Sequence, residues 1–245
     1  MRKILILGAT SAIAIATARM LAGAGHALVL ASRNEPALRT LADDLRTRGA
    51  PRVETMRFDA TAYHTHQDLV KSAAAALGGL DTAIVAYGSL PDQVAIQDVP
   101  ERVIAELETN FTSVASLLTI LAAEFERQEH GTIVAISSVA SDRGRAVNYV
   151  YGSAKAGLTC FLSGLRQRLW GKGVEVITIK PGLVDTPMTA RFRKGPLWTA
   201  PEVVATGIVH AIEARKAIVY LPAYWRPIMA GIRLLPERLF MRLRF

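Results

Sequence analysis

The chain has 245 residues, of which 51% are hydrophobic, and its formal net charge is +8 at pH 7. This length can bury the core of one domain, and the absence of repeats and low-complexity tracts excludes a repeat array or a disordered chain. Residues 191–245 hold 10 basic and 3 acidic side chains, so they supply +7 of the +8. No module that interleaves basic and aromatic residues accompanies this charge, and we therefore expect no nucleic-acid partner.

Strand and helix patterns alternate along the chain. The short apolar runs that we expect to be strands occupy residues 3–7, 27–31, 52–58, 80–87, 131–137, 174–180 and 217–221. Helix-like segments lie between them, at 12–24, 35–48, 66–77, 100–128 and around Tyr151. Several runs are nearly continuous in Val, Ile, Leu and Ala, which indicates strands covered on both faces. The pattern predicts an α/β fold, a single domain with a Rossmann-type, doubly wound parallel sheet of about seven strands.

Glycine and polar residues follow six of these strands, at the point where each strand ends. They are Gly8-Ala9-Thr10-Ser11, Ala31-Ser32-Arg33, Asp59, Ala86-Tyr87-Gly88, Ser137-Ser138 and Pro181-Gly182. Ligands of open parallel sheets bind outside the carboxyl ends of the strands. We therefore expect these six segments to converge on one crevice.

Tyr151 and Lys155 are the pair that indicates a chemistry. Four residues apart in a helix-like segment, they should project from one face, one turn apart. An ammonium beside a phenol favours the phenolate and lowers a pKa that is near 10 when unperturbed, which brings proton exchange with an alcohol or ketone closer to neutral pH. A pair of this kind suits carbonyl reduction or alcohol oxidation.

These residues resemble the short-chain dehydrogenase/reductase family over roughly residues 3–215. The family's glycine-rich turn, TGxxxGxG, is matched by LGATSAIA, in which Ala12 and Ala14 replace the second and third glycines. A methyl group at Ala12 is expected to lengthen the approach to a pyrophosphate unless the backbone adjusts. The segments ETNFTS, ISS, YGSAK and KPGLVDTPM match further family motifs in the family's order.

The resemblance implies a catalytic set of Asn110, Ser138, Tyr151 and Lys155. In it, Tyr151 donates a proton to the substrate carbonyl, Lys155 lowers the tyrosine pKa and binds the nicotinamide ribose, Ser138 holds the carbonyl oxygen, and Asn110 holds a water. The implied cofactor contacts are Gly8, Thr10, Ser11, Ala12, Ile13, Ser32, Arg33, Asp59, Ala60, Ala86, Tyr87, Gly88, Tyr151, Lys155, Pro181, Gly182, Val184 and Thr186.

Arg33 favours NADP(H) over NAD(H) as the cofactor. NAD-specific relatives place an acidic residue at the end of the second strand, where this chain has Ser32 followed by Arg33. A guanidinium binds a 2′-phosphate through charge-assisted hydrogen bonds. The alternative is a solvated arginine at the start of a loop.

Residues 1–221 are expected to form the dinucleotide-binding domain, with a lid near 186–200, and residues 222–245 a basic amphipathic C-terminal tail. The tail has no uncharged run of the ~20 residues that a spanning helix needs. Its helix, broken around Pro236, can lie on an anionic membrane surface or pack against a second subunit of a homo-oligomer. Both alternatives stay open.

Arg143, Arg145 and Trp198 are substrate-binding candidates. Because both arginines lie between Ser138 and Tyr151, they should border the crevice, where they bind an anionic group or remain solvated. The segments RGRAVNYVYGSAK and AYGSLPDQ are similar to the decaprenylphosphoryl keto-pentose reductases of the family. This similarity implies a ketone on a lipid-phosphate-linked sugar, or another small carbonyl compound, as the substrate.

The remaining expectations concern compartment, metal and alternative functions. Cys160, the single cysteine, excludes an internal disulfide, suits a reducing compartment and is expected to be buried. The single cysteine and an N-terminal segment that resembles a strand predict a cytoplasmic protein. If the tail binds a membrane, the protein is expected to be peripheral at its surface. No residue cluster indicates a metal site. The alternatives to an oxidoreductase are a catalytically silent dinucleotide sensor, suggested by Ala12 and Ala14, and a membrane-surface scaffold.

Overall fold

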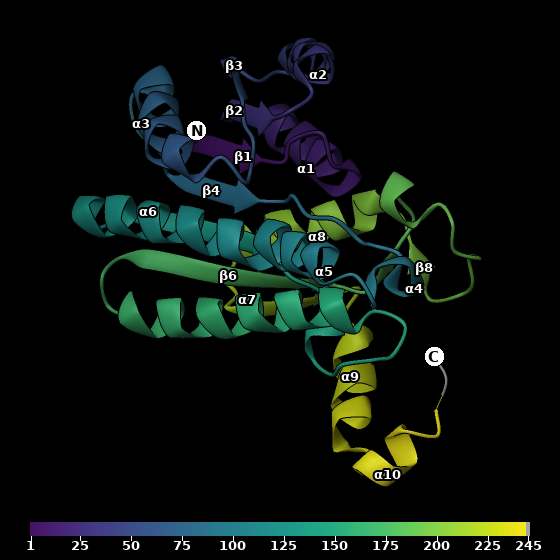
Figure 1. Ribbon diagram of the computed structural model, residues 1–245. Coiled ribbons are helices and arrows are strands. Elements are labelled where there is room, and N and C mark those ends of the chain that lie inside the picture. Colours follow the sequence, from purple (N-terminus) through teal and green to yellow (C-terminus); the bar gives the residue numbers. More distant parts are fainter. Residues whose placement is uncertain (244–245) are drawn as a thin grey trace.

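A computed structural model describes residues 1–243 as one doubly wound α/β domain (Figure 1). Its main sheet has seven strands in the order β3-β2-β1-β4-β5-β6-β9, and every neighbouring pair is parallel. The strands are β1 (Lys3–Leu7), β2 (Ala27–Ser32), β3 (Val53–Arg57), β4 (Thr82–Val85), β5 (Gly131–Ile136), β6 (Val174–Pro181) and β9 (Ile218–Leu221). The predicted fold is confirmed.

Helices cover both faces of this sheet and complete two hydrophobic cores. The helices α1 (Ala12–Gly23), α2 (Glu35–Thr47) and α8 (Pro201–Glu213) lie on one face, whereas α3 (His66–Leu77), α5 (Pro100–Leu107), α6 (Ser113–Gln128) and α7 (Tyr149–Arg168) lie on the other. The strands alternate between the two cores, with Leu5 and Leu7 facing one and Ile4 and Ile6 the other. Burial on both faces explains why the strand sequences are almost uniformly apolar.

The predicted helix over 100–128 is interrupted by a π-helical turn. This turn, Glu108–Thr112, separates α5 from α6 and contains Asn110. A π-bulge adds a residue to a helical turn and is frequent at functional sites, because it turns one side chain out of the regular helical pattern. Helical periodicity alone does not reveal such an insertion.

The structure adds elements that the sequence pattern did not predict. These are α8, the short helix α4 (Gln93–Ile96), and a two-stranded sheet formed by β7 (Leu183–Val184) and β8 (Trp198–Thr199). Cys160 lies in α7 as expected, but it is exposed. The expectation of a buried thiol was wrong, because residue 160 lies on the side of α7 that faces away from the core.

The C-terminal tail forms α9 (Trp225–Leu234) and α10 (Glu237–Phe240), which project beyond the sheet (Figure 1). Its last two residues, 244 and 245, lie outside the described part of the chain. Trp225 and Met229 are buried and form a small cluster with Val139, from the loop after β5. Among residues 1–243, no helix is both long and apolar enough to cross a membrane.

Candidate active site

One cavity of about 1590 Å³ lies at the carboxyl edge of the sheet. It receives residues from the ends of β1 to β6, from the start of α7, from the predicted lid and from α9. All of the predicted catalytic and cofactor-binding residues line this cavity, as do Arg145 and Trp198. Arg143, which was also predicted to bind substrate, does not line the cavity.

The turn between β1 and α1 is shaped by Gly8. This residue has a φ of +77°, and a Cβ atom there would lie 2.6 Å from Cβ of Tyr87 and 2.7 Å from its backbone nitrogen. Only glycine therefore fits at position 8. The following residues begin α1, and the Ser11 hydroxyl caps it by accepting a hydrogen bond from the Ala14 amide at 3.3 Å.

The two alanines of the glycine-rich turn have different surroundings. Ala12 borders the cavity at the first residue of α1, where helix N-termini favour an anion. Ala14 is 1% exposed and packs in the core between the sheet and α1. A methyl group at residue 14 therefore fills the interior, and only the one at residue 12 meets the cavity.

Arg33 stands at the far end of the cavity, exposed, directly after β2. Beside it, the Ser32 hydroxyl lies 3.0 Å from the Thr10 hydroxyl and accepts a hydrogen bond from the Asn34 amide at 3.1 Å. The Asp59 carboxylate accepts two hydrogen bonds from Thr61, which lower its pKa. This end of the cavity thus offers an arginine and hydroxyl groups, with Asp59 nearby as the acidic group.

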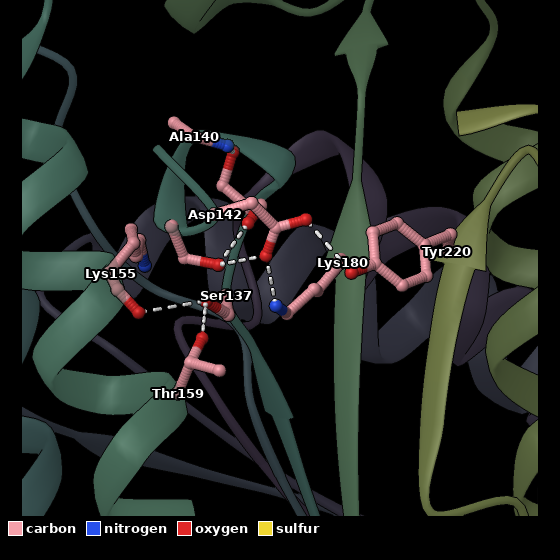
Figure 2. Close-up of polar contacts among 9 residues, drawn as sticks. Ser137, Ala140, Asp142, Lys155, Thr159, Lys180 and Tyr220 are labelled. Carbon is pink, nitrogen blue, oxygen red and sulfur yellow. Dashed lines mark hydrogen bonds and ion pairs between the residues drawn. The ribbon is translucent and has the colours of Figure 1, made fainter. Parts of the chain in front are cut away.

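Tyr151 and Lys155 lie in the first turns of α7. The Lys155 Nζ atom is 5.7 Å from the centre of the Tyr151 ring and donates a hydrogen bond to the Ile136 carbonyl at 3.1 Å. The Ser137 hydroxyl donates to the Lys155 carbonyl at 3.1 Å and lies 2.8 Å from the Thr159 hydroxyl, so β5 and α7 are joined at this point (Figure 2). The helix that carries Tyr151 and Lys155 is therefore anchored to the end of a central strand.

Burial dominates the pKa values of this pair. It raises the pKa of Tyr151 above its ordinary value, although a hydrogen bond with Ser138 acts in the opposite direction. It also lowers the pKa of Lys155 to about 8. The net shift of the Tyr151 pKa is therefore upward, opposite to the direction expected from the lysine charge, because burial is its largest cause.

A buried ion pair fixes the loop that carries Ser138. Asp142, from this loop, pairs with Lys180 of β6 and accepts a hydrogen bond from the Tyr220 hydroxyl of β9 at 2.8 Å (Figure 2). The two charged side chains are only 2% and 6% exposed. Burial and the Asp142 carboxylate raise the pKa of Tyr220 to about 12, so the phenol remains a donor. The loop is thus bound to two neighbouring strands.

Arg143, predicted to contact the substrate, instead binds the C-terminal end of α9. Its guanidinium donates to the Ile232 and Leu235 carbonyls at 2.7 and 2.6 Å, at the C-terminal end of α9, and to the Glu237 carboxylate at 2.7 Å. It also stacks on the Phe240 ring at 3.8 Å. The prediction was wrong because the last carbonyls of a helix lack intrahelical donors and attract a cation.

The cavity wall contains buried polar atoms without hydrogen-bond partners. Five buried side-chain polar atoms have no hydrogen-bond partner among residues 1–243, and four of these belong to residues that line the cavity: Gln93 Nε2, Arg145 Nε, Asn148 Oδ1 and Trp225 Nε1. A buried polar atom without a partner costs roughly 1–3 kcal/mol, so these atoms are available to a ligand or to water. We call these four residues the polar recess.

Gln93 caps the start of α7, where the side chain of Asn148 does not. Asn148 occupies the N-cap position of α7, yet its side chain makes no capping hydrogen bond. The Gln93 side chain accepts the hydrogen bond from the Val150 amide at 3.1 Å in its place. The Asn148 oxygen and the Gln93 amide nitrogen are both left without a hydrogen-bond partner among residues 1–243. Sequence reasoning did not identify Gln93, Asn148 or Trp225, because their roles depend on contacts between distant segments.

The sequence matches the model of the short chain dehydrogenase family over residues 2–196. The chain belongs to this family. It is 40% identical over 240 residues to an uncharacterized oxidoreductase of Mycobacterium tuberculosis, which covers 98% of this chain and 96% of that protein. The chain is accordingly an NAD(P)-dependent oxidoreductase that acts on CH–OH or C=O groups.

Solved structures share the fold. A short chain dehydrogenase from Burkholderia cenocepacia, in complex with NADP, has a TM-score of 0.83 and 20% identity and covers 98% of this chain and 96% of its own. A 3-oxoacyl-[acyl-carrier protein] reductase from Brucella melitensis, in complex with NAD, has a TM-score of 0.80 and 23% identity and covers 92% and 97%. Because both cofactors occur in proteins of this fold, the fold does not decide between them.

Burial of Lys155 predicts a pH-dependent stability. Since its pKa is lowered to about 8 in the folded chain from an ordinary 10.5, the unfolded chain binds the additional proton between these values. Raising the pH from 8 to 9.5 should therefore stabilise the wild type relative to Lys155→Met by on the order of 1–2 kcal/mol. Urea denaturation of both proteins at the two pH values measures this difference, and an unchanged difference would contradict the burial of a titrating lysine.

Proposed function

We propose that this enzyme uses NADPH to reduce a ketone to a secondary alcohol, with Tyr151 as the proton donor. The observation that carries the proposal is the position of Tyr151 and Ser138 in the same cavity as the predicted cofactor-binding residues from the strand ends. The chain can hold NADPH there through the N-terminus of α1 and through Arg33, and bound NADPH supplies the hydride. Side chains of the protein supply the proton and hold the substrate carbonyl.

The protonation states of the site suit reduction. The raised pKa of Tyr151 keeps its phenol protonated at neutral pH, and the charged Lys155 beside it stabilises the phenolate that forms when the proton leaves. Ser138 is in place to hold the carbonyl oxygen, because its hydroxyl interacts with the Tyr151 phenol. The proton then passes from Tyr151 to the carbonyl oxygen as the carbon accepts the hydride.

Replacing Tyr151 with Phe should reduce turnover at least ~100-fold, the usual lower range for loss of a general acid. NADPH affinity, measured by fluorescence titration, should change by less than about twofold, since the ring remains. Tyr149, exposed at the start of the same helix, provides the control, and Tyr149→Phe should be nearly as active as the wild type. Substantial turnover by Tyr151→Phe would remove the phenol from the reaction.

Arg33 supports a preference for NADPH over NADH. It is exposed beside the hydroxyls of Ser32 and Thr10, and the chain has Ser32 where NAD-specific relatives carry an acidic residue. A 2′-phosphate placed there would gain a charge-assisted hydrogen bond, which typically contributes about 1.5–3 kcal/mol.

Arg33→Ala should raise the KM for NADPH roughly tenfold or more and leave that for NADH within about twofold, because only NADPH carries the phosphate. The matched control is Arg52→Ala, which removes an exposed arginine paired with Glu54. Steady-state kinetics with both cofactors make the comparison. A lower KM for NADH than for NADPH in the wild type would refute the preference.

For the substrate, we propose a keto-sugar joined through a phosphate to a lipid, as in the decaprenylphosphoryl keto-pentose reductases that the chain resembles. The polar recess offers donors and an acceptor for hydroxyl groups, and Arg145 offers a cation with no acidic partner within residues 1–243. Ile228, Ile232 and Leu235 of the tail provide an apolar cavity wall. Together these features match a hydroxylated ring, a phosphate and a hydrocarbon chain.

The tail also supports a membrane as the source of this substrate, although a second subunit remains the alternative. Leu234 and Met241 are 83% and 76% exposed, and the neighbouring arginines of α9 and α10 are exposed as well. Apolar side chains among arginines bind anionic bilayer surfaces. A tail that borders the cavity and contacts the bilayer would bring a lipid-linked substrate directly to Tyr151.

Arg145→Met should raise the KM for a phosphorylated keto-sugar by about tenfold or more and leave the KM for an uncharged ketone unchanged, since only the former has an anion to bind. Arg168→Met, at the opposite end of α7, removes an arginine paired with Glu126 and serves as the control. The comparison uses KM values for both substrates. An equal effect of Arg145→Met on the two substrates would contradict the anion-binding role.

A further inference from the structure

The Glu106 carboxylate lies directly beside the side chain of Asn110. It lies on α5, four residues before Asn110, and lines the cavity. The Asn110 amide nitrogen donates to Glu106 Oε2 at 3.1 Å and to the Glu106 carbonyl at 3.2 Å. The Ser89 hydroxyl donates to the same carboxylate oxygen at 2.5 Å. The mechanism proposed above makes no use of this group.

The opposite side of Asn110 faces Lys155. Its Oδ1 atom accepts a hydrogen bond from the Ser89 amide at 3.1 Å. A methyl group on Gly88 would lie 2.6 Å from this Oδ1 atom and 3.4 Å from Lys155 Nζ, so only glycine leaves the space between them open. A water molecule in this space would bridge the Asn110 oxygen and the Lys155 amine. With that water, Lys155, Asn110, Ser89 and Glu106 would form a continuous polar series.

The reaction needs such a series because each reduction consumes one proton. As the substrate carbon accepts the hydride, the O–H bond of Tyr151 breaks and the O–H bond of the alcohol forms. The phenolate must then regain a proton before the next turnover. Lys155 is the adjacent donor, but its ammonium is 3% exposed and must itself be reprotonated from outside.

We propose that Glu106 is the outer proton carrier that recharges Lys155, an inference that rests on the proposed function. The carboxylate takes a proton from solvent at the cavity wall and releases it through the Ser89 hydroxyl and the bridging water to the Lys155 amine. The ammonium then returns a proton to the Tyr151 phenolate. One proton from solvent replaces the one that leaves in the alcohol, so the carriers are unchanged after each cycle.

Glu106→Gln tests this role, because it keeps the shape and an oxygen acceptor for Ser89 and Asn110 but cannot carry a proton. Ketone reduction by NADPH should slow about tenfold in kcat, with KM values within about twofold. The deficit should grow with pH as solvent protons become scarce, the D₂O isotope effect on kcat should rise, and added imidazole should restore the rate. Glu108→Gln, which alters the carboxylate that Tyr63 contacts at 3.4 Å, should behave like the wild type.

Two results would overturn the proposal. An unchanged kcat, pH profile and isotope effect in Glu106→Gln would show that protons take another route. A slower variant with weaker NADPH affinity, but with no rescue by imidazole and no change in isotope effect, would show that Glu106 only positions Asn110.

A measurement without turnover separates this proposal from the proposed function. If the wild type reduces no ketone, the proposed function is contradicted. The relay can be tested without turnover, because NADP⁺ binding in weak buffer should release a proton through it. Stopped-flow recording with an indicator dye should show release at least about fivefold slower in Glu106→Gln than in the wild type or Glu108→Gln. Equal rates in all three proteins would refute the relay.

Discussion

Parallel pairing of the seven main strands is the constraint on which the site depends. Because all of these strands point the same way, the residues that follow them meet at one edge, although Gly8 and Gly182 are far apart in sequence. Right-handed crossovers then place helices on both faces and leave this edge open. The sheet thus converts six separate loops into the wall of one cavity, and α7 adds Tyr151 and Lys155 to it.

Two sets of contacts hold the cavity wall near Tyr151. Asp142 fixes the Ser138 loop to β6 and β9 through Lys180 and Tyr220, while the adjacent Arg143 holds the end of α9 (Figure 2). Breaking a buried ion pair by removing one partner leaves a charge without compensation and costs about 3–5 kcal/mol. The loop therefore has little freedom, and the tail is joined to it through consecutive residues.

The fold and the placement of Tyr151 and Lys155 on one helix could be predicted because their signals are local. A strand covered on both faces must be apolar throughout, and a spacing of four residues brings Tyr151 and Lys155 to one helix face. Both signals are contained within short segments. The positions of the strand ends then follow from the sheet alone, which is why the predicted cofactor-binding residues gather in one cavity.

The features that sequence could not predict arise from contacts between distant segments. The partners of Arg143 lie 89 and 92 residues further along the chain, and Gln93 caps a helix that begins 56 residues after it. The π-helical turn at Asn110 interrupts the helix expected over 100–128, and helical periodicity gave no sign of it. The pKa of Tyr151 depends on burial that only the packed structure defines.

These contacts also clarify the alanine substitutions in the glycine-rich turn. Ala14 is accommodated in the core, so it does not argue against cofactor binding, and the question narrows to the single methyl group of Ala12. That methyl group lies at the N-terminus of α1, where backbone amides and the helix dipole still favour a phosphate. The silent-sensor alternative loses its main support in consequence.

The central claim is that the cavity holds NADP(H) with its nicotinamide beside Tyr151. A crystal structure of the chain with NADP⁺ tests it most directly. The account predicts the 2′-phosphate at Arg33, the pyrophosphate at the start of α1 and the nicotinamide between Gly182 and the Tyr151 hydroxyl. A cofactor bound with its nicotinamide remote from Tyr151, or with no contact between its 2′-phosphate and Arg33, would contradict the account.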